Sequence, residues 1–250
     1  MELPYAQHPL LIWLWRFYGS DTYLNEEKGA APVDLSGLPK FLQRRWDEIL
    51  QLTLQHLAVV ALSLVLAMVL GVVIGALVWD RPIARSVSIT SAGIALTIPS
   101  LALLAILSPI LGLGWGPTVV ALVFYSLLPI IRNTVVGLRE VPAEVLESAR
   151  GIGMVPLTVL WRIQMPIAWP VILTGVRVAA QLTIGIAAIA AYVAGPGLGQ
   201  YIFKGLSSLG SKNALNYALV GTVGVVILAL LVDAAFILIT RLTTSRGLRA

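Results

Sequence analysis

The sequence contains no cysteine and only two histidines in 250 residues. Without cysteine the chain can form neither a disulfide framework nor a thiol-based site. Two histidines give little for a metal centre, so we expect no metal site. Charged residues are scarce as well, at 12% of the chain against about a quarter in soluble proteins. These absences exclude a disulfide-stabilised scaffold and argue against an ordinary soluble protein.

A phosphate-binding loop is also missing. No Gly-x-x-x-x-Gly-Lys-Ser/Thr motif occurs, and this loop is what cradles nucleotide phosphates in P-loop ATPases. We therefore predict that the chain is not an enzyme and binds no cofactor of its own. The net charge is +5, but lysines and arginines are scattered singly between apolar runs, so we expect no nucleic acid partner.

Apolar residues are abundant: they make up 58% of the chain and give a mean hydropathy of +0.90. A helix of about twenty apolar residues crosses a bilayer core of roughly 30 Å. Five runs of this kind are present, at 52–79, 87–111, 117–137, 167–193 and 214–240. The predicted fold class is all-α, a polytopic membrane protein with about five transmembrane helices. Its transmembrane domain, 52–240, would lie between an N-terminal tail, 1–51, and a C-terminal tail, 241–250.

Basic residues orient these spans in the lipid bilayer. The loops after the first and third spans and the C-terminal tail carry most of the arginines, whereas the loop 112–116 has none and 195–213 has only Lys204 and Lys212. By the positive-inside rule the arginine-rich side is cytoplasmic. Five crossings then put the C-terminus inside and the N-terminus outside. The N-terminal tail should be extracytoplasmic or interfacial, because its Trp-rich segment 8–18 is too short to span.

The loop between the third and fourth spans is predicted to fold as two short helices. Pro142 can open the first, because its missing N–H is one of the unpaired donors at a helix start, and Gly151 can stop it. Pro156 can open the second, over 157–163, and Pro166 can close it.

One face of the first short helix is apolar. Val145, Leu146 and Ala149 recur at helical spacing and would let the helix lie in a groove on a partner. The alternative is a helical elbow that lies on the bilayer without a partner.

Prolines, hydroxyls and glycines interrupt the apolar spans. Those that are candidates for lining a pathway are Thr97, Pro99, Ser100, Pro129, Asn133, Gly197 and Gly199. Pro99 would kink the second span, either beside a pathway or as an ordinary proline kink. Gly71 and Gly75 form a small-residue face that lets helices approach closely, a pattern for which packing is the default interpretation.

Two charges lie well inside predicted spans. Arg177 is about 16 Å along a helix from Pro166, and Asp233 is about 12 Å from Arg241, so both have a similar depth. A lone charge at a helix centre costs roughly 2.5 to 3.5 kcal/mol, so we expect the two to pair. The alternatives are that Arg177 bonds backbone carbonyls near the second span, or that Asp233 reaches the interface.

The sequence resembles a family of transport proteins. The spacing of the Glu-Ala-Ala loop of bacterial ABC importer permeases is matched by Glu147, Ser148, Ala149, Gly153, Ile163, Met165 and Pro166, with Ser148 for Ala and Met165 for Leu. Together with the segments 97–104, 127–134 and 197–203, this loop is similar to permeases of osmoprotectant importers for glycine betaine, choline and carnitine.

That resemblance implies a methionine-permease-like fold in a bacterial inner membrane, with 138–166 as a coupling elbow whose seven matched residues receive the ATPase. It implies two cytoplasmic ATPase subunits that bind ATP and Mg, and a second permease, identical or related. It also implies an extracytoplasmic binding protein, expected as a separate chain because no such domain follows Ala250. The alternatives are an ABC permease for an amino acid such as methionine, and an ATP-independent secondary transporter.

Overall fold

The computed structural model describes residues 37–243. The chain divides into two units, 1–44 and 45–250. In the first unit the described helix is α3, Leu38–Arg44. Most of the predicted N-terminal tail and of the C-terminal tail lies outside the described residues, and the description below concerns the second unit.

Helices make up the second unit. In chain order they are α4 (Trp46–Val78), α5 (Pro82–Thr97), α6 (Ser100–Leu111), α7 (Trp115–Arg139), α8 (Ala143–Gly151), α9 (Pro156–Val159), a π turn (Leu160–Gln164), α10 (Met165–Ala190), a 3-10 turn (Ala191–Val193), α11 (Gly199–Ser207) and α12 (Ala214–Thr243). Residues 37–243 contain no strand, and the predicted all-α class is confirmed.

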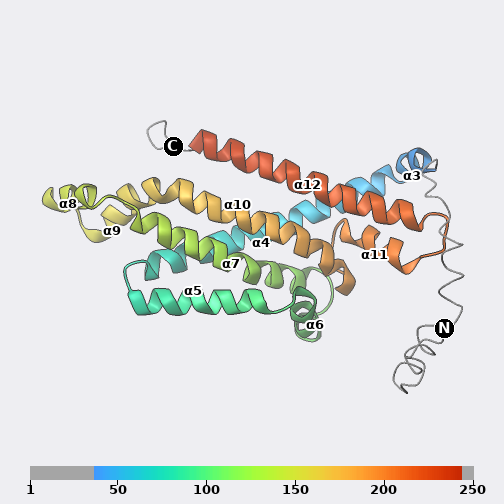
Figure 1. The fold of residues 1–250 in the computed structure, drawn as a ribbon, viewed down its shortest axis with the longest axis horizontal. Helices are drawn as coiled ribbons and strands as arrows, with labels where there is room; N and C mark the ends of the chain where they lie inside the picture. Colours follow the sequence, from blue (N-terminus) through green and yellow to red (C-terminus); the bar gives the residue numbers. More distant parts are fainter. Residues whose placement is uncertain (1–36, 244–250) are drawn as a thin grey trace, which may run out of the picture. The chain divides into compact units, whose positions relative to one another are not determined.

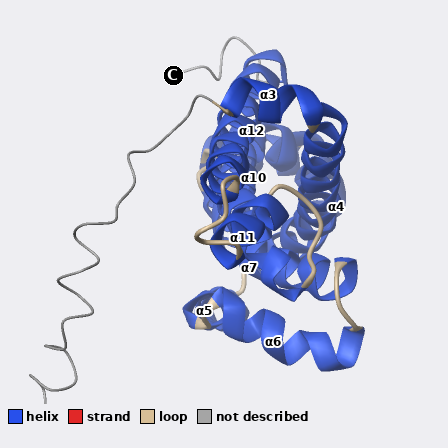
Figure 2. Ribbon diagram, turned by 90° about the vertical axis from the view of Figure 1, so that its right-hand side faces the viewer, coloured by secondary structure: helices blue, strands red, loops and turns tan. Residues whose placement is uncertain are grey.

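Four stretches of helix are long and apolar enough to cross a membrane: α4, α7, α12 and the run from α9 to the 3-10 turn. Helices α5 and α6 would make a fifth as a broken pair bent by 94°, and Figure 2 shows α6 turned away from α5. The predicted span 87–111 is therefore interrupted beside Pro99, as expected, but by a break between two helices and not by a kink in one helix. Residues that precede proline are driven to extended backbone, and Ile98 (φ −69°, ψ 125°) ends α5 for this reason.

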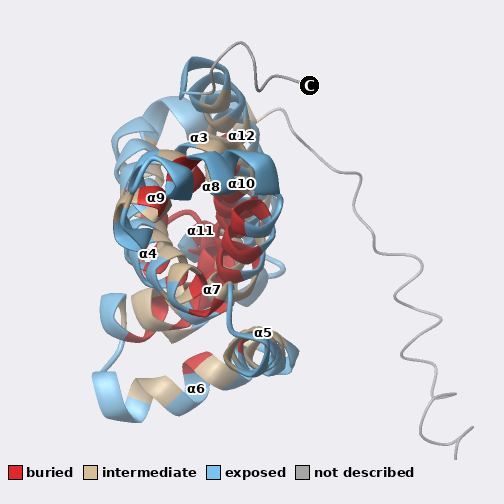
Figure 3. Ribbon diagram, turned by 90° about the vertical axis from the view of Figure 1, so that its left-hand side faces the viewer, coloured by how far each residue is buried: buried red, intermediate tan, exposed pale blue. Residues whose placement is uncertain are grey.

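Helix α7 lies at the centre of the unit, with α4 and α10 packed against it. One apolar cluster joins all three through Ala67 of α4, Ile130 of α7 and Ile172 of α10. Figure 3 shows the buried residues concentrated along α7 and α10. Since α4 and α12 are exposed over most of their length, the core belongs mainly to α7 and α10.

Glycines permit the close contacts of α7 with both neighbours. A Cβ on Gly71 would lie 2.7 Å from Ile130 Cγ2, and one on Gly75 would lie 2.6 Å from Thr134 Cβ. The predicted close approach at the paired glycines of the first span is thus confirmed, with α7 as the partner. On the other side, a Cβ on Gly175 would lie 2.6 Å from the carbonyl oxygen of Pro129.

The connections gather at two ends of the helices. Figure 1 places α8, α9 and the last turns of α12 at one end, and α6 and α11 at the other. The arginine-rich loops of the sequence therefore share one end, and the arginine-poor loops share the other.

Candidate functional site

The elbow begins with α8, whose end is defined by a glycine in left-handed backbone. Gly153 has φ +83°. The N–H of Met154 donates to the carbonyl of Ala149 at 3.1 Å, and that of Gly153 donates to the carbonyl of Arg150 at 2.9 Å. This is the Schellman arrangement of a helix end. Gly153 thus stops the helix, whereas Gly151, the predicted stop, is its last residue.

The residues that are buried and exposed on α8 differ from those predicted. Ala149 is buried at 3% exposure, so it holds the helix to its own chain. Leu146 is half-buried, while Glu144, Glu147 and Ser148 are exposed. The prediction that Ala149 shares a partner-facing apolar face is therefore corrected. Of the three residues of that face only Val145, at 37%, is exposed, and it lies among polar and charged side chains.

The second arm of the elbow does not end at Pro166. Helix α9 runs into the π turn, in which the N–H of Met165 donates to Leu160, and the chain continues directly into α10. Proline is tolerated in the first turn of a helix, where its missing N–H is not needed, and Pro166 occupies that place in α10. Met165 is buried in the core, Ile163 is half-buried and Pro166 is exposed.

A cavity of about 620 Å³ separates the elbow from the end of α4. Its lining includes Asp80 and Arg81 after α4, Arg150 of α8, Met154 and the buried Gln164 of the π turn. The elbow is therefore not packed solidly against the end of the first span.

The break between α5 and α6 is held by a hydroxyl group from the central helix. Tyr125 of α7 donates to the carbonyl oxygen of Ile98 at 2.6 Å. Thr97 is exposed and donates to the carbonyl of Ile94 at 2.7 Å, Pro99 is exposed, and Ser100 begins α6. The carbonyl group of Ile98, at the helix end that Pro99 creates, thus accepts a hydrogen bond from α7. The sequence does not signal this contact between distant residues.

The other pathway candidates lie in packed contacts. Pro129 stands inside α7, and Asn133 donates to its carbonyl oxygen at 2.8 Å where α10 crosses. Gly197 (φ +114°) is buried against α4, since a Cβ there would lie 2.7 Å from His56 Cβ. Gly199 is buried against Ala188 of α10. The seven candidates do not converge on one site.

His56 is a buried polar residue that the sequence analysis missed. Its side chain is fully buried in α4, and Nε2 lies 3.1 Å from the carbonyl oxygen of Ile184 in α10. Nδ1 has no hydrogen-bond partner in the part of the chain that the structure describes. An ionisable side chain near the start of an apolar span was the signal available.

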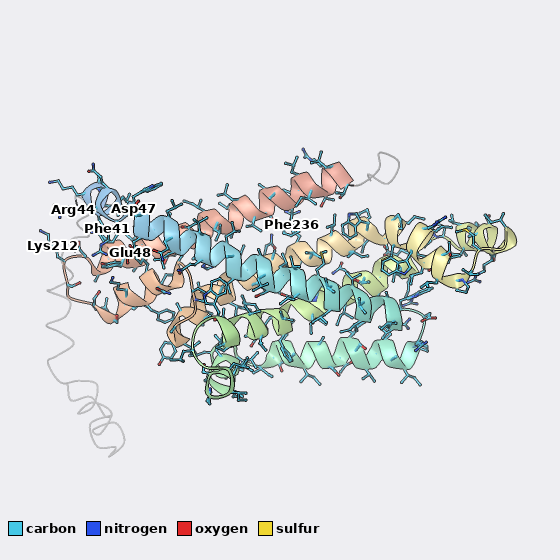
Figure 4. All side chains as sticks on the ribbon, turned by 180° about the vertical axis from the view of Figure 1, so that it is seen from behind. Phe41, Arg44, Asp47, Glu48, Lys212 and Phe236 are labelled. Atoms are coloured by element: carbon cyan, nitrogen blue, oxygen red, sulfur yellow. The ribbon has the colours of Figure 1, made fainter. Side chains whose placement is uncertain are left out.

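Arg177 and Asp233 form a bidentate ion pair between α10 and α12. Arg177 Nε donates to Asp233 Oδ1 at 2.6 Å and its terminal nitrogen donates to Oδ2 at 2.7 Å. Gln181, which the sequence analysis did not single out, also donates to Oδ1 at 2.7 Å. Phe236, labelled in Figure 4, follows Asp233 on α12 and packs against the apolar core.

Charged and aromatic side chains join the start of α4 to α11 and α12. Arg45 pairs with Glu48 at 2.6 Å, and this hydrogen bond raises the pKa of the guanidinium. Lys204 Nζ lies 3.8 Å from Glu48 and 4.5 Å from the ring centre of Tyr217, which Arg45 also covers at 5.0 Å. Tyr201 meets the same ring edge-on. The cluster fixes the entry of α4 at the end opposite the elbow.

Comparisons of sequence place these features in a family. Residues 67–244 match the model of the family described as binding-protein-dependent transport system inner membrane component. The chain is 37% identical to the choline transport system permease protein OpuBB of Bacillus subtilis, over 84% of this chain and 95% of that one. It is also 37% identical to the glycine betaine/carnitine/choline transport system permease protein OpuCB of the same species, over 84% and 94%.

A solved structure has the same fold. The MetNI methionine ABC transporter in an inward-facing conformation superposes with a TM-score of 0.69 at 24% identity, covering 79% of this chain and 96% of that one. The two chains thus share a fold.

Proposed function

The chain belongs to the family of binding-protein-dependent transport system inner membrane components, and we propose that it forms the passage for a quaternary-ammonium osmoprotectant such as glycine betaine, choline or carnitine. It is a multi-pass membrane permease subunit of an ABC importer. The observation that supports the substrate class is the identity of 37% to two osmoprotectant permeases, which extends over almost their full lengths.

The partners follow from what this chain can and cannot do. It contains no phosphate-binding loop, so ATP and Mg belong to two ATPase subunits in the cytoplasm. The outward side of α8, with Glu144, Glu147 and Ser148, is the surface that these subunits contact. A second permease completes the passage, and an extracytoplasmic binding protein delivers the substrate.

Methionine transport is the weaker alternative. The methionine transporter is similar at only 24% identity, which supports the shared fold alone. An ATP-independent transporter is the other alternative. It would need a chain of ionisable groups across the membrane, and two charges, Arg177 and Asp233, lie well inside the predicted spans, too few for such a chain.

The substrate is tested by uptake into vesicles that hold the complex with its ATPase and binding protein. We expect labelled glycine betaine to accumulate, excess carnitine or choline to compete, and excess methionine to have no effect. Competition by methionine together with no uptake of glycine betaine would contradict the proposed substrate class.

The elbow end is cytoplasmic in this proposal, and labelling of introduced cysteines tests the orientation. The natural absence of cysteine removes background reaction. Leu113→Cys, 70% exposed between α6 and α7, should react with a membrane-impermeant thiol reagent on intact cells. Glu140→Cys, exposed at the end of α7, should react only after the cells are permeabilised. The reverse pattern would show that the orientation is inverted.

A further inference from the structure

The exposed side of α10 has two edges of different chemistry. Each residue turns a helix by about 100°, so residues spaced by three and four share an edge. One edge is polar or small and carries Thr174, Arg177, Gln181 and Gly185. The neighbouring edge is apolar and carries Val178, Leu182 and Ile189, each about 40% exposed. An apolar edge suits lipid, whereas a continuous polar edge within a span suits water or a polar partner.

The ion pair lies on the polar edge and is not sealed in the core. The side chains of Arg177 and Asp233 are 38% and 24% exposed, and Gln181 beside them is exposed. A Cβ on Gly185, one turn further along, would meet no atom within 4 Å. Charged groups inside a membrane face the bundle interior or a water-filled cavity rather than lipid.

We propose that the polar edge of α10 lines the passage, and that Arg177 and Asp233 form a station at which a zwitterionic substrate exchanges with the ion pair. The proposal rests on the function proposed above and names the residues that would sense the substrate's two charges. The substrate carboxylate takes the place of Asp233 on the guanidinium, and its trimethylammonium group lies against the released carboxylate of Asp233.

Charge balance is the physical reason for this exchange. A guanidinium presents a fork of donors that matches a carboxylate, so Arg177 can bind either that of Asp233 or that of the substrate. A zwitterion supplies one charge of each sign, so neither protein charge is left alone while the pair is open. A substrate with only a cation, such as choline, would leave Arg177 without an anion. The station therefore favours zwitterions over choline.

The test compares glycine betaine with choline in the reconstituted complex, at concentrations that saturate its binding protein with each. Arg177→Gln combined with Asp233→Asn keeps hydrogen-bonding side chains and leaves no lone charge. This double variant should lower the ratio of glycine betaine uptake to choline uptake by about tenfold, the factor that about 1.4 kcal/mol gives. The matched control, Arg177→Asp combined with Asp233→Arg, retains both charges and should keep most of the preference.

Labelling gives a second, independent measurement. Gln181→Cys should react with a methanethiosulfonate reagent that carries a trimethylammonium group, and glycine betaine should slow the reaction. Leu182→Cys, on the apolar edge, should not react.

The outcomes separate this inference from the proposed function. If the unaltered complex takes up neither substrate, the proposed function fails and the inference fails with it. If it takes up both, and the neutral double variant lowers both by the same factor, the pair serves only packing and the station is overturned. An unreactive Gln181→Cys would mean that a second permease or lipid covers the polar edge, which also overturns the inference.

Discussion

Ser148→Trp should reduce ATP-driven uptake by roughly tenfold to a hundredfold while the permease still folds and inserts. Ser148 lies on the exposed side of α8, and its hydroxyl bonds only the carbonyl of Glu144 within the same helix, at 2.8 Å. An indole ring there disturbs no core contact but would prevent close seating against the ATPase that we propose to bind this side, and overpacking of this kind costs about 1 to 3 kcal/mol. Uptake and the yield of inserted protein are the two measurements.

Two variants sharpen this test. Ser148→Ala keeps the small size and should transport normally. Ala149→Trp changes the buried neighbour, so it should lower the yield of folded protein in addition to uptake. If Ser148→Trp transports at the normal rate with its ATPase still bound, the outward side of α8 is not the contact surface.

Gly175→Leu should prevent most of the chain from reaching its folded state. The new Cβ would lie 2.6 Å from both the carbonyl oxygen of Pro129 and the Cβ of Asn133. A backbone carbonyl cannot rotate away like a long side chain, so α10 must separate from α7 along the central contact of the fold. We expect a loss of about 3 kcal/mol or more, the upper part of the range for overpacked cores.

Gly185→Leu is the matched control on the same helix. A side chain at Gly185 meets no atom within 4 Å, so this variant should fold in normal yield. Resistance to proteolysis in detergent, compared across the two variants, measures the difference. Equal resistance would show that α7 and α10 do not cross as closely as described.

Much of the fold was predictable because apolar length and proline chemistry are local properties. Four of the five predicted spans correspond to long helices. The break in the second span was not predicted, because a run of apolar residues does not distinguish a continuous helix from two helices joined at Ile98. The hydrogen bond from Tyr125 to the carbonyl of Ile98 stabilises the bend there. That bond joins α7 to the end of α5, and sequence pattern carries no signal of it.

In the elbow, too, local features were predictable and contacts between elements were not. Its two short helices were predicted from Pro142 and Pro156, yet the orientation of Ala149 was not, since the buried side of a short helix depends on its neighbours, here α9. The continuity of the π turn with α10 was missed for a related reason: Pro166 marks a helix start as readily as a helix end, and only the neighbouring turn decides between them.

The most direct test of the central claim is uptake of labelled glycine betaine by vesicles that contain the purified permease with its ATPase and binding protein. ATP or a non-hydrolysable analogue is enclosed on the ATPase side. We predict accumulation only when the ATPase is present and ATP can be hydrolysed, with none from the permease alone. Accumulation by the permease alone, driven by an ion gradient without ATP, would contradict the account.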